Sequence, residues 1–392
     1  MKTSVVSFFD SANLGDLLIA DSLARFASEF GPAGRISYSG RPFRLINPDQ
    51  FGGGDQVEPA PPGFRERLVA TRAGALAWRV KYTRGTEHAA IRDLLADSDV
   101  LVLGGGNMIF DLDHWTHSSD RFSYFSRTAA RAGTPTFGIS LGIGPFASIR
   151  QHKEACRALD RCRWLTFRDR ASLDLYEEYG RHAGRLSVDP VLMMPRSLER
   201  QMERRGKIAF NLVEPRIIGS TTDEQRNMLL RRYVRDVEEW VASGHTVELF
   251  STDRADLACL HEVAAAVRSG RCGVRMIDGL ASLLAMYSEA DVVVACRMHA
   301  LIVAFTQGVP IVGLSWQQKV SSFFDLVGRP RQCLGLRQHA PGRLPRLVSE
   351  AMTQPDAFCI DDAVRERLRR LDAVNRQVMR EVIEETTLSG PA

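Results

Sequence analysis

The chain has 392 residues, a formal net charge of +4, and a composition that is 44% hydrophobic and 25% charged. This length predicts two domains of an ordinary globular protein, and the mild basic balance suits a small anionic substrate. The sequence has no long basic run, no zinc-finger spacing and no apolar stretch of about 18 residues, so it predicts neither a nucleic-acid partner nor a transmembrane segment.

Cysteine usage and the N-terminus indicate the cellular compartment. Seven cysteines include no CxxC pair, and their odd number argues against a disulfide framework. The apolar run that follows Lys2 is short and ends at Asp10, unlike a secretory signal. We therefore expect a cytoplasmic protein. The basic helical pattern at 64–84 would allow peripheral contact with the inner face of the membrane, but a solvated helix face accounts for it more simply.

Strand and helix patterns alternate through the first half of the chain. An amphipathic helix is expected over 17–30, a Gly- and Pro-rich loop over 40–63 and a helix over 64–82. Buried strands are expected over 4–9, 99–106, 134–145, 163–170 and 186–195.

A second alternating series follows residue 206. Its strands are expected over 207–213, 245–252, 274–278, 291–296 and 331–336, and the tail after Pro341 has helical spacing. Such alternation predicts parallel sheets with helices on both faces. We therefore expect an α/β protein with two Rossmann-like domains facing a cleft: residues 1–200, residues 201–345, and C-terminal helices over 346–392 that pack back across the domains.

Two polar or glycine-rich segments follow the first two strands. In Asn13-Leu14-Gly15-Asp16, Asp16 is expected to cap the next helix, and Asn13 and Asp16 are candidates for ligand contact; a simple capped turn is the alternative. The glycines at 104–106 are expected to form a turn in which Gly105, Gly106 and Asn107 approach a ligand closely, or a turn of purely structural purpose.

The glycines at 104–106 do not form the dinucleotide-binding motif. Their spacing is not GxGxxG, which disfavours a dinucleotide-dependent enzyme. A third candidate cleft loop is GIGP at 142–145, with Gly144, and its alternative is again a plain turn.

Acidic and histidine residues over 111–117 resemble a metal cluster. No other segment supplies matching ligands, so a polar loop rim is favoured and no metal is expected. Asp111 remains a candidate for contact with a sugar hydroxyl. Farther along, Arg168 follows a strand, where its guanidinium can grip a carboxylate or phosphate; a salt bridge to Asp169 or Asp174 is the alternative.

The most informative segment is Arg297-Met298-His299. It follows a buried strand directly and opens a helix, so it lies at the carboxyl edge of a sheet, where open α/β folds bind ligands. Arg297 and the helix N-terminus favour an anion and a neutral imidazole, which suits His299 for proton transfer; a core histidine is the alternative. Downstream, Trp316 can stack on a ligand and Lys319 can neutralise a phosphate, although each is more often structural or solvated.

Together these motifs resemble the polysaccharide pyruvyl transferase family. Their order and spacing match from Asn13 to Lys319. The matching segments are NLGD at 13–16, GGG-x4-D at 104–111, GIGP at 142–145, RDRAS at 168–172, DP at 189–190, RMHA at 297–300, and GVP followed by a lysine nine residues after Pro310.

The resemblance implies a fold similar to the GT-B glycosyltransferases, with acceptor contacts in residues 1–200 and donor contacts in residues 201–345. It also implies phosphoenolpyruvate as co-substrate, no cofactor, and a sugar, sugar nucleotide or lipid-linked glycan as acceptor, which receives a pyruvate ketal. Donor binding is implied for Arg168 and Arg297, with Met298 and Lys319 beside them, and proton transfer for His299.

The chain departs from the family at Trp316, where a tyrosine is common, and in the segment 40–90, which we expect to shape acceptor choice. One alternative function is a nucleotide-sugar glycosyltransferase on the same scaffold. Its ribose carboxylate would be Glu214 or Asp278. The other alternative is a non-catalytic member of the fold.

Overall fold

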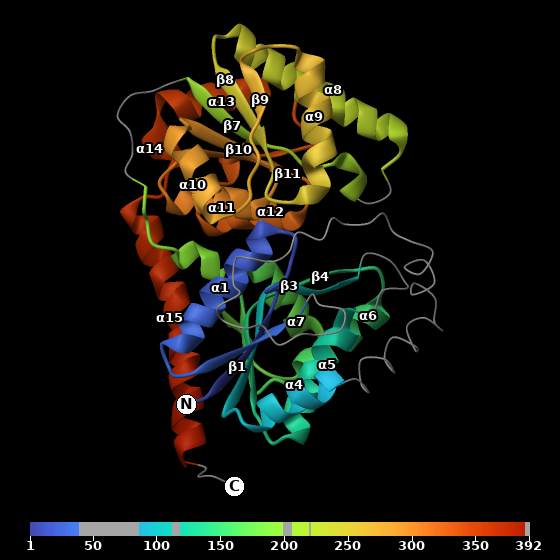
Figure 1. Ribbon diagram of the computed structural model, residues 1–392, viewed down its shortest axis with the longest axis vertical. Helices are drawn as coiled ribbons and strands as arrows, with labels where there is room; N and C mark the ends of the chain where they lie inside the picture. The colour runs from blue at the N-terminus through green and yellow to red at the C-terminus, as the bar shows by residue number, and fades with distance from the viewer. Residues whose placement is uncertain (39–85, 112–117, 199–205, 219–220, 389–392) are drawn as a thin grey trace. The chain divides into compact units, whose positions relative to one another are not determined.

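The computed structural model describes residues 1–38, 86–111, 118–198, 206–218 and 221–388 (Figure 1). The helix predicted over 64–82 and most of the metal-like segment, residues 112–117, lie outside these described residues. The chain divides into two compact units. Unit 1 comprises Met1–Ser11, Asp16–Pro190 and Arg370–Ala392, and unit 2 comprises Ala12–Gly15 and Val191–Arg369.

Unit 1 contains a six-stranded parallel sheet with the order β2-β1-β3-β4-β5-β6. Its central strands are continuous apolar runs, as in Val100–Leu103, because helices cover both faces. The strands are β1 (Thr3–Ser7), β2 (Ala33–Ser37), β3 (Val100–Asp111), β4 (Thr136–Phe146), β5 (Trp164–Phe167) and β6 (Arg185–Leu186).

The helices of unit 1 lie on the two faces of this sheet (Figure 1). One face is covered by α4 (Thr86–Ala96), α5 (Ser118–Arg131), α6 (Ile149–Leu159) and α7 (Arg170–Tyr179). On the other face lie α1 (Leu14–Ser28) and the C-terminal part of α15 (Asp362–Leu388).

Helix α15 is anchored to the sheet by a buried amide. Asn375 donates to Ser140 Oγ at 3.0 Å and accepts from Thr166 Oγ1 at 2.7 Å. Both hydroxyls belong to sheet strands and are fully buried. The C-terminal part of α15 is therefore held against the sheet of unit 1, since these buried polar groups satisfy one another.

Unit 2 contains a second six-stranded parallel sheet, with the order β12-β11-β10-β7-β8-β9. Read from β9, this is the 3-2-1-4-5-6 order of the Rossmann fold, and the order reverses between β7 and β10. The strands are β7 (Lys207–Asn211), β8 (Thr246–Phe250), β9 (Cys272–Val274), β10 (Val292–Ala295), β11 (Ile311–Ser315) and β12 (Cys333–Gly335).

Helices also cover both faces of the second sheet (Figure 1). α8 (Asp223–Ala242), α9 (Leu257–Val267) and α13 (Arg343–Thr353), with the short α14 (Pro355–Phe358), pack on one face. α10 (Leu280–Glu289), α11 (Met298–Thr306) and α12 (Gln318–Leu326) lie on the other. α11 is apolar nearly all round because it is almost wholly buried.

The α/β class with two Rossmann-like sheets is confirmed, but several local predictions are wrong. The glycines at 104–106 do not form a turn, and GIGP is not a loop. Both segments stay inside long strands, β3 and β4, which pair beyond the glycines with register shifts. Positive φ angles of +77° and +79° at Gly105 and Gly106 distort the strand without ending it.

Other differences arise where side-chain patterns were weak. β2 was not expected, because Gly34, Arg35 and Ser37 interrupt its apolar pattern. The strand expected over 186–195 shrinks to β6 and is followed by a 3-10 turn at Pro190–Met193. The strand expected over 274–278 lies earlier, at Cys272–Val274. Among the described residues, no helix is both long and apolar enough to cross a membrane.

Candidate functional site

The candidate site of unit 2 lies where the strand order of its sheet reverses. β7 and β10 are neighbours there, with Asn211 paired to Ala295 at their carboxyl ends. Asn211 accepts a hydrogen bond from the backbone N–H of Arg297 at 2.9 Å and donates to Phe250 O at 3.1 Å. One amide therefore ties the exits of β7, β8 and β10 together, at the place where doubly wound sheets bind ligands.

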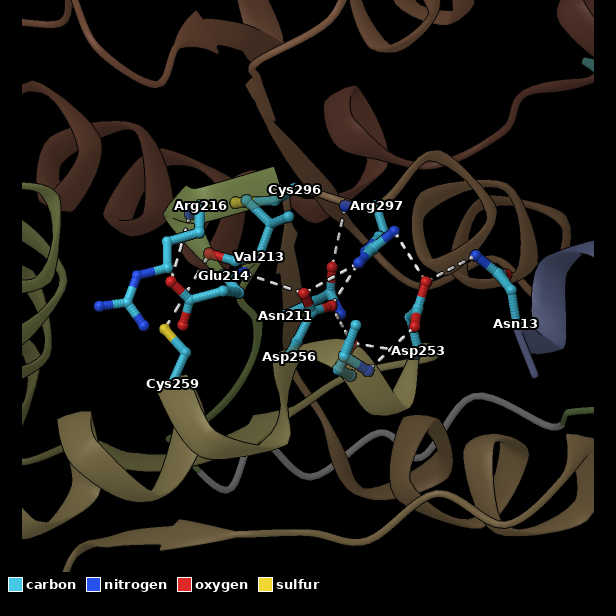
Figure 2. Close-up of polar contacts among 12 residues, drawn as sticks. Asn13, Asn211, Val213, Glu214, Arg216, Asp253, Asp256, Cys259, Cys296 and Arg297 are labelled. Atoms are coloured by element: carbon cyan, nitrogen blue, oxygen red, sulfur yellow. Dashed lines mark hydrogen bonds and ion pairs between the residues drawn. The ribbon is translucent and has the colours of Figure 1, made fainter. Parts of the chain in front are cut away.

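Arg297 lies between two carboxylates that follow β8 (Figure 2). Its Nε and Nη2 donate to the two oxygens of Asp256 at 2.9 and 2.8 Å, and Nη1 lies 3.0 Å from Asp253 Oδ2. Burial alone would lower the pKa of Arg297, but the hydrogen bond to Asp256 and the charges of both carboxylates outweigh it and raise the pKa. Arg297 is therefore a permanent, oriented cation.

Asp256 is completely buried and held from several sides. Besides Arg297, it accepts from Ser251 Oγ at 2.5 Å and from the backbone N–H of Glu214 at 2.9 Å. Glu214 in turn forms a bidentate pair with Arg226 of α8 at 2.7 and 3.0 Å. Burial would raise the pKa of Glu214, but the hydrogen bond from Arg226 outweighs this and the pKa is lowered. Glu214 is thus committed to an internal ion pair, which weakens its candidacy as a ribose ligand.

The segment NLGD reaches the same site through Asn13. Asn13 Nδ2 donates to Asp253 Oδ2 at 3.2 Å, and Leu14 N donates to Thr252 O at 2.9 Å. Asn13 Oδ1 accepts the backbone N–H of Gly15 at 2.8 Å, so Asn13 caps α1. The prediction that Asp16 is the cap is wrong: Asp16 lies in the first turn and accepts from Ser11 Oγ at 3.0 Å.

Gly15 lies directly against the imidazole of His299. A Cβ atom built on Gly15 would be 2.2 Å from Nδ1 of His299 and 2.5 Å from its Cγ. His299 is half-buried in the first turn of α11, and Met298 before it is buried. Two motifs nearly three hundred positions apart, NLGD and RMHA, therefore meet in unit 2, and glycine is needed at position 15 because the histidine ring occupies the space of a side chain.

Trp316 and Lys319 follow the neighbouring strand β11. The indole N–H of Trp316 donates to Cys296 O at 3.0 Å, which holds the end of β10 just before Arg297. The ring of Trp316 packs against the core of the sheet, and Lys319 Nζ lies 5.9 Å from its centroid. The structural role considered for Trp316 is thus observed, and its role in ligand contact stays a prediction.

In unit 1, Arg168 is only 5% exposed and lies at the carboxyl end of β5. Nη1 donates to Asp189 Oδ2 at 3.1 Å, and Nε lies 3.5 Å from Asp169 Oδ2. The salt bridge considered with Asp169 is thus present, whereas Asp174 pairs with Arg170. Asp189 of the DP motif is a partner that sequence reasoning did not assign. The donor-binding role implied for Arg168 stays a prediction.

Gly142 makes room for Arg168, which yields a testable expectation. A Cβ atom at Gly142 would be 2.7 Å from Nε of Arg168. We expect Gly142→Ala to destabilise the protein by about 1–3 kcal/mol, because the buried, paired guanidinium must shift. Thermal and urea unfolding measure this cost. Gly273→Ala, whose added Cβ meets nothing within 4 Å, is the matched control, and equal unfolding curves for the two variants would contradict the expectation.

The remaining candidates of unit 1 have mainly structural contacts. Cβ atoms at Gly105 and Gly106 would meet side chains such as Ile19 at 2.2 and 3.1 Å, so these glycines serve close packing against α1. Asn107 Nδ2 donates to Gly144 O at 2.9 Å and joins β3 to β4 beyond the glycines of β3. Asp111 is buried and accepts Ser118 N at 2.8 Å, at the start of α5.

Residues that sequence reasoning missed in unit 2 are Asn211, Asp253 and Asp256. The signal for the two aspartates was the polar segment STDRAD after β8, whose position at a carboxyl strand end matches that of Arg297, and Asn211 is the last residue of β7. Within the parts of the chain that the structure describes, no three or more His, Cys, Asp or Glu residues are arranged to hold a metal ion.

The architecture and site define a class of protein with two Rossmann-like domains of the GT-B kind, as predicted. The similarity to a UDP-N-acetylglucosamine 2-epimerase covers 99% of this chain and 97% of the epimerase chain, with a TM-score of 0.55 and 10% sequence identity. The similarity to the Methanocaldococcus jannaschii UDP-GlcNAc 2-epimerase covers 97% of this chain and 99% of that enzyme, with a TM-score of 0.55 and 10% sequence identity. The Neisseria meningitidis enzyme, bound to UDP-GlcNAc, matches 100% of each chain, with a TM-score of 0.52 and 9% identity.

These likenesses establish the fold, and the sequence establishes the family. No curated protein matches the chain. The chain belongs to the polysaccharide pyruvyl transferase family, whose model matches residues 13–318. The matched range includes both NLGD and RMHA, the motifs that meet around Asp253.

Proposed function

We propose that this protein is a phosphoenolpyruvate-dependent pyruvyl transferase that builds a pyruvate ketal on a sugar acceptor. One observation carries the proposal: Asn13 and Gly15 lie against Asp253 and His299 in the unit that orients Arg297. A titratable imidazole and a fixed cation at a sheet switch point suit proton transfer to an anionic donor. Family membership supports a transferase that modifies polysaccharides.

The reaction requires proton transfer and charge neutralisation. A proton adds to C3 of phosphoenolpyruvate, a sugar hydroxyl attacks C2, and the C2–O bond to phosphate breaks. A second hydroxyl then closes the ketal ring. The two hydroxyls release two protons, of which C3 takes one and the phosphate the other. We assign His299 to this proton transfer, as acid or as base.

Cations stabilise the carboxylate and the departing phosphate. We propose Arg297 as the main donor contact, with Arg168 and Lys319 as further candidates, since arginine binds both groups in bidentate fashion. The scheme requires no metal or cofactor, because these cations can neutralise the leaving group. Asp111 is our weaker candidate for acceptor binding, as a base or as a hydrogen-bonding anchor.

The acceptor is a sugar, a sugar nucleotide or a lipid-linked glycan, and the proposed location is the cytoplasm. Incubation with phosphoenolpyruvate and a panel of such acceptors should release inorganic phosphate and add one pyruvyl group to the acceptor, detected by mass. Release of a nucleoside diphosphate from a sugar nucleotide would instead identify a glycosyltransferase. Donor binding without turnover of any acceptor would indicate a non-catalytic protein.

A further inference from the structure

We propose that Asp253 is a displaceable counter-ion of Arg297, whose place on Nη1 is taken by an oxygen of the anionic donor, whereas Asp256 permanently positions the guanidinium. The inference rests on the proposed function in taking the donor to be an anion that binds Arg297. It assigns opposite effects on donor affinity to two aspartates that touch the same side chain (Figure 2).

The two carboxylates differ in burial. The side chain of Asp256 is 0% exposed and that of Asp253 is 20% exposed. Removing a fully buried carboxylate from its partner leaves two uncompensated charges, whereas water can replace the partner of an exposed one. Asp253 is therefore the carboxylate that can leave Arg297 at low cost.

They also differ in how they hold the guanidinium. Asp256 takes both Nε and Nη2 and is itself anchored by Ser251 and by the backbone N–H of Glu214. Asp253 pairs with Nη1 through Oδ2 at 3.0 Å. Its carboxylate also accepts from Asn13 Nδ2 at 3.2 Å and from Ala255 N at 3.0 Å, so it keeps two donors when it leaves Arg297.

The charges of this cluster explain why displacement is needed. One guanidinium faces two carboxylates, Asp253 and Asp256, so an incoming anion meets an excess of negative charge beside its cation. Moving Asp253 away from Nη1 has two effects: it frees the N–H groups of Nη1 for the incoming anion, and it lowers the repulsion of that anion. Neutralising Asp253 should therefore strengthen anion binding, and neutralising Asp256 should weaken it.

The test compares Asp253→Asn with Asp256→Asn by calorimetric titration of phosphoenolpyruvate and of inorganic phosphate at fixed, low salt. We expect Asp253→Asn to bind each anion about three- to tenfold more tightly, since asparagine removes the charge and still caps the following turn. We expect Asp256→Asn to bind them at least about tenfold more weakly, because Arg297 loses its orientation.

Asp325→Asn is the matched control, because it removes the same charge from an exposed position of α12 in the same unit. Unchanged or weaker anion binding by Asp253→Asn, or tightening by the control to the same degree, would overturn the inference. Asp256→Asn can unfold the protein, so its fold is checked by circular dichroism, and if it does not fold, the Asp253→Asn arm decides alone.

Pyruvyl transfer is assayed separately on the wild-type protein. Tighter anion binding by Asp253→Asn without any transfer would reject the proposed function and keep the inference. Transfer to a sugar together with unchanged or weaker binding by Asp253→Asn would keep the function and reject the inference.

Discussion

Replacing His299 with alanine is expected to lower kcat for pyruvyl transfer by about 10²- to 10⁴-fold, the usual contribution of a positioned acid or base. The protein should stay folded, because His299 is only half-buried and the core of α11 is supplied by its other residues. Phosphate release under saturating donor measures this effect.

Two further variants separate chemistry from packing. His299→Gln keeps a planar polar group against Gly15 and should be as slow as the alanine variant, since an amide does not transfer protons at neutral pH. His261→Ala, at an exposed position of α9 in the same unit, should retain normal turnover. Near-normal kcat in both His299 variants would reject the proton-transfer role.

Replacing Gly15 with alanine should lower kcat by about 10²-fold, because the new Cβ would lie 2.2 Å from Nδ1 of His299. Either the imidazole or the segment Asn13–Gly15 must move, and displacements of about 1 Å in an active site can cost this much. Gly270→Ala, where an added Cβ meets nothing within 4 Å, should behave like the wild type. Steady-state kinetics and thermal unfolding of both variants test the expectation.

A double-mutant cycle shows whether steric overlap between the new Cβ of residue 15 and the imidazole of His299 causes the effect of Gly15→Ala. In a His299→Ala background the ring is gone, so Gly15→Ala should cost markedly less stability than it does in the wild type. Equal costs in the two backgrounds would mean that residues 15 and 299 do not interact, and the site built from NLGD and RMHA would then have to be abandoned.

Much of the architecture could be predicted because a buried strand or helix has a recognisable pattern of apolar residues in the local sequence. The run Val292–Cys296 is apolar at every position, as expected of a parallel strand covered on both faces, and it predicted β10 closely. Five-residue β2 was missed since Gly34, Arg35 and Ser37 give it no such run. The glycine segments of β3 and β4 were misjudged because the pairing of two neighbouring strands, rather than glycine content, decides where each strand ends.

The functional residues show the same division. His299, Arg297 and Arg168 could be selected from the sequence, since each follows a buried strand and carries a side chain suited to anions or protons. The carboxylates that pair with the two arginines could not be selected from the sequence. Asp253 and Asp256 lie about forty positions from Arg297, and no local spacing links them. Asp189 likewise reaches Arg168 only because β5 and β6 are neighbours in the sheet, and each residue follows the end of one of these strands.

By itself, the sequence determined that this protein has two parallel α/β units with cationic and titratable residues at strand ends, because alternating burial and strand-end position are local properties. Only the tertiary structure decided that Arg297 is held by two carboxylates and that Gly15 lies under His299. Contacts between distant segments depend on strand order and side-chain packing, and no local pattern records either of them.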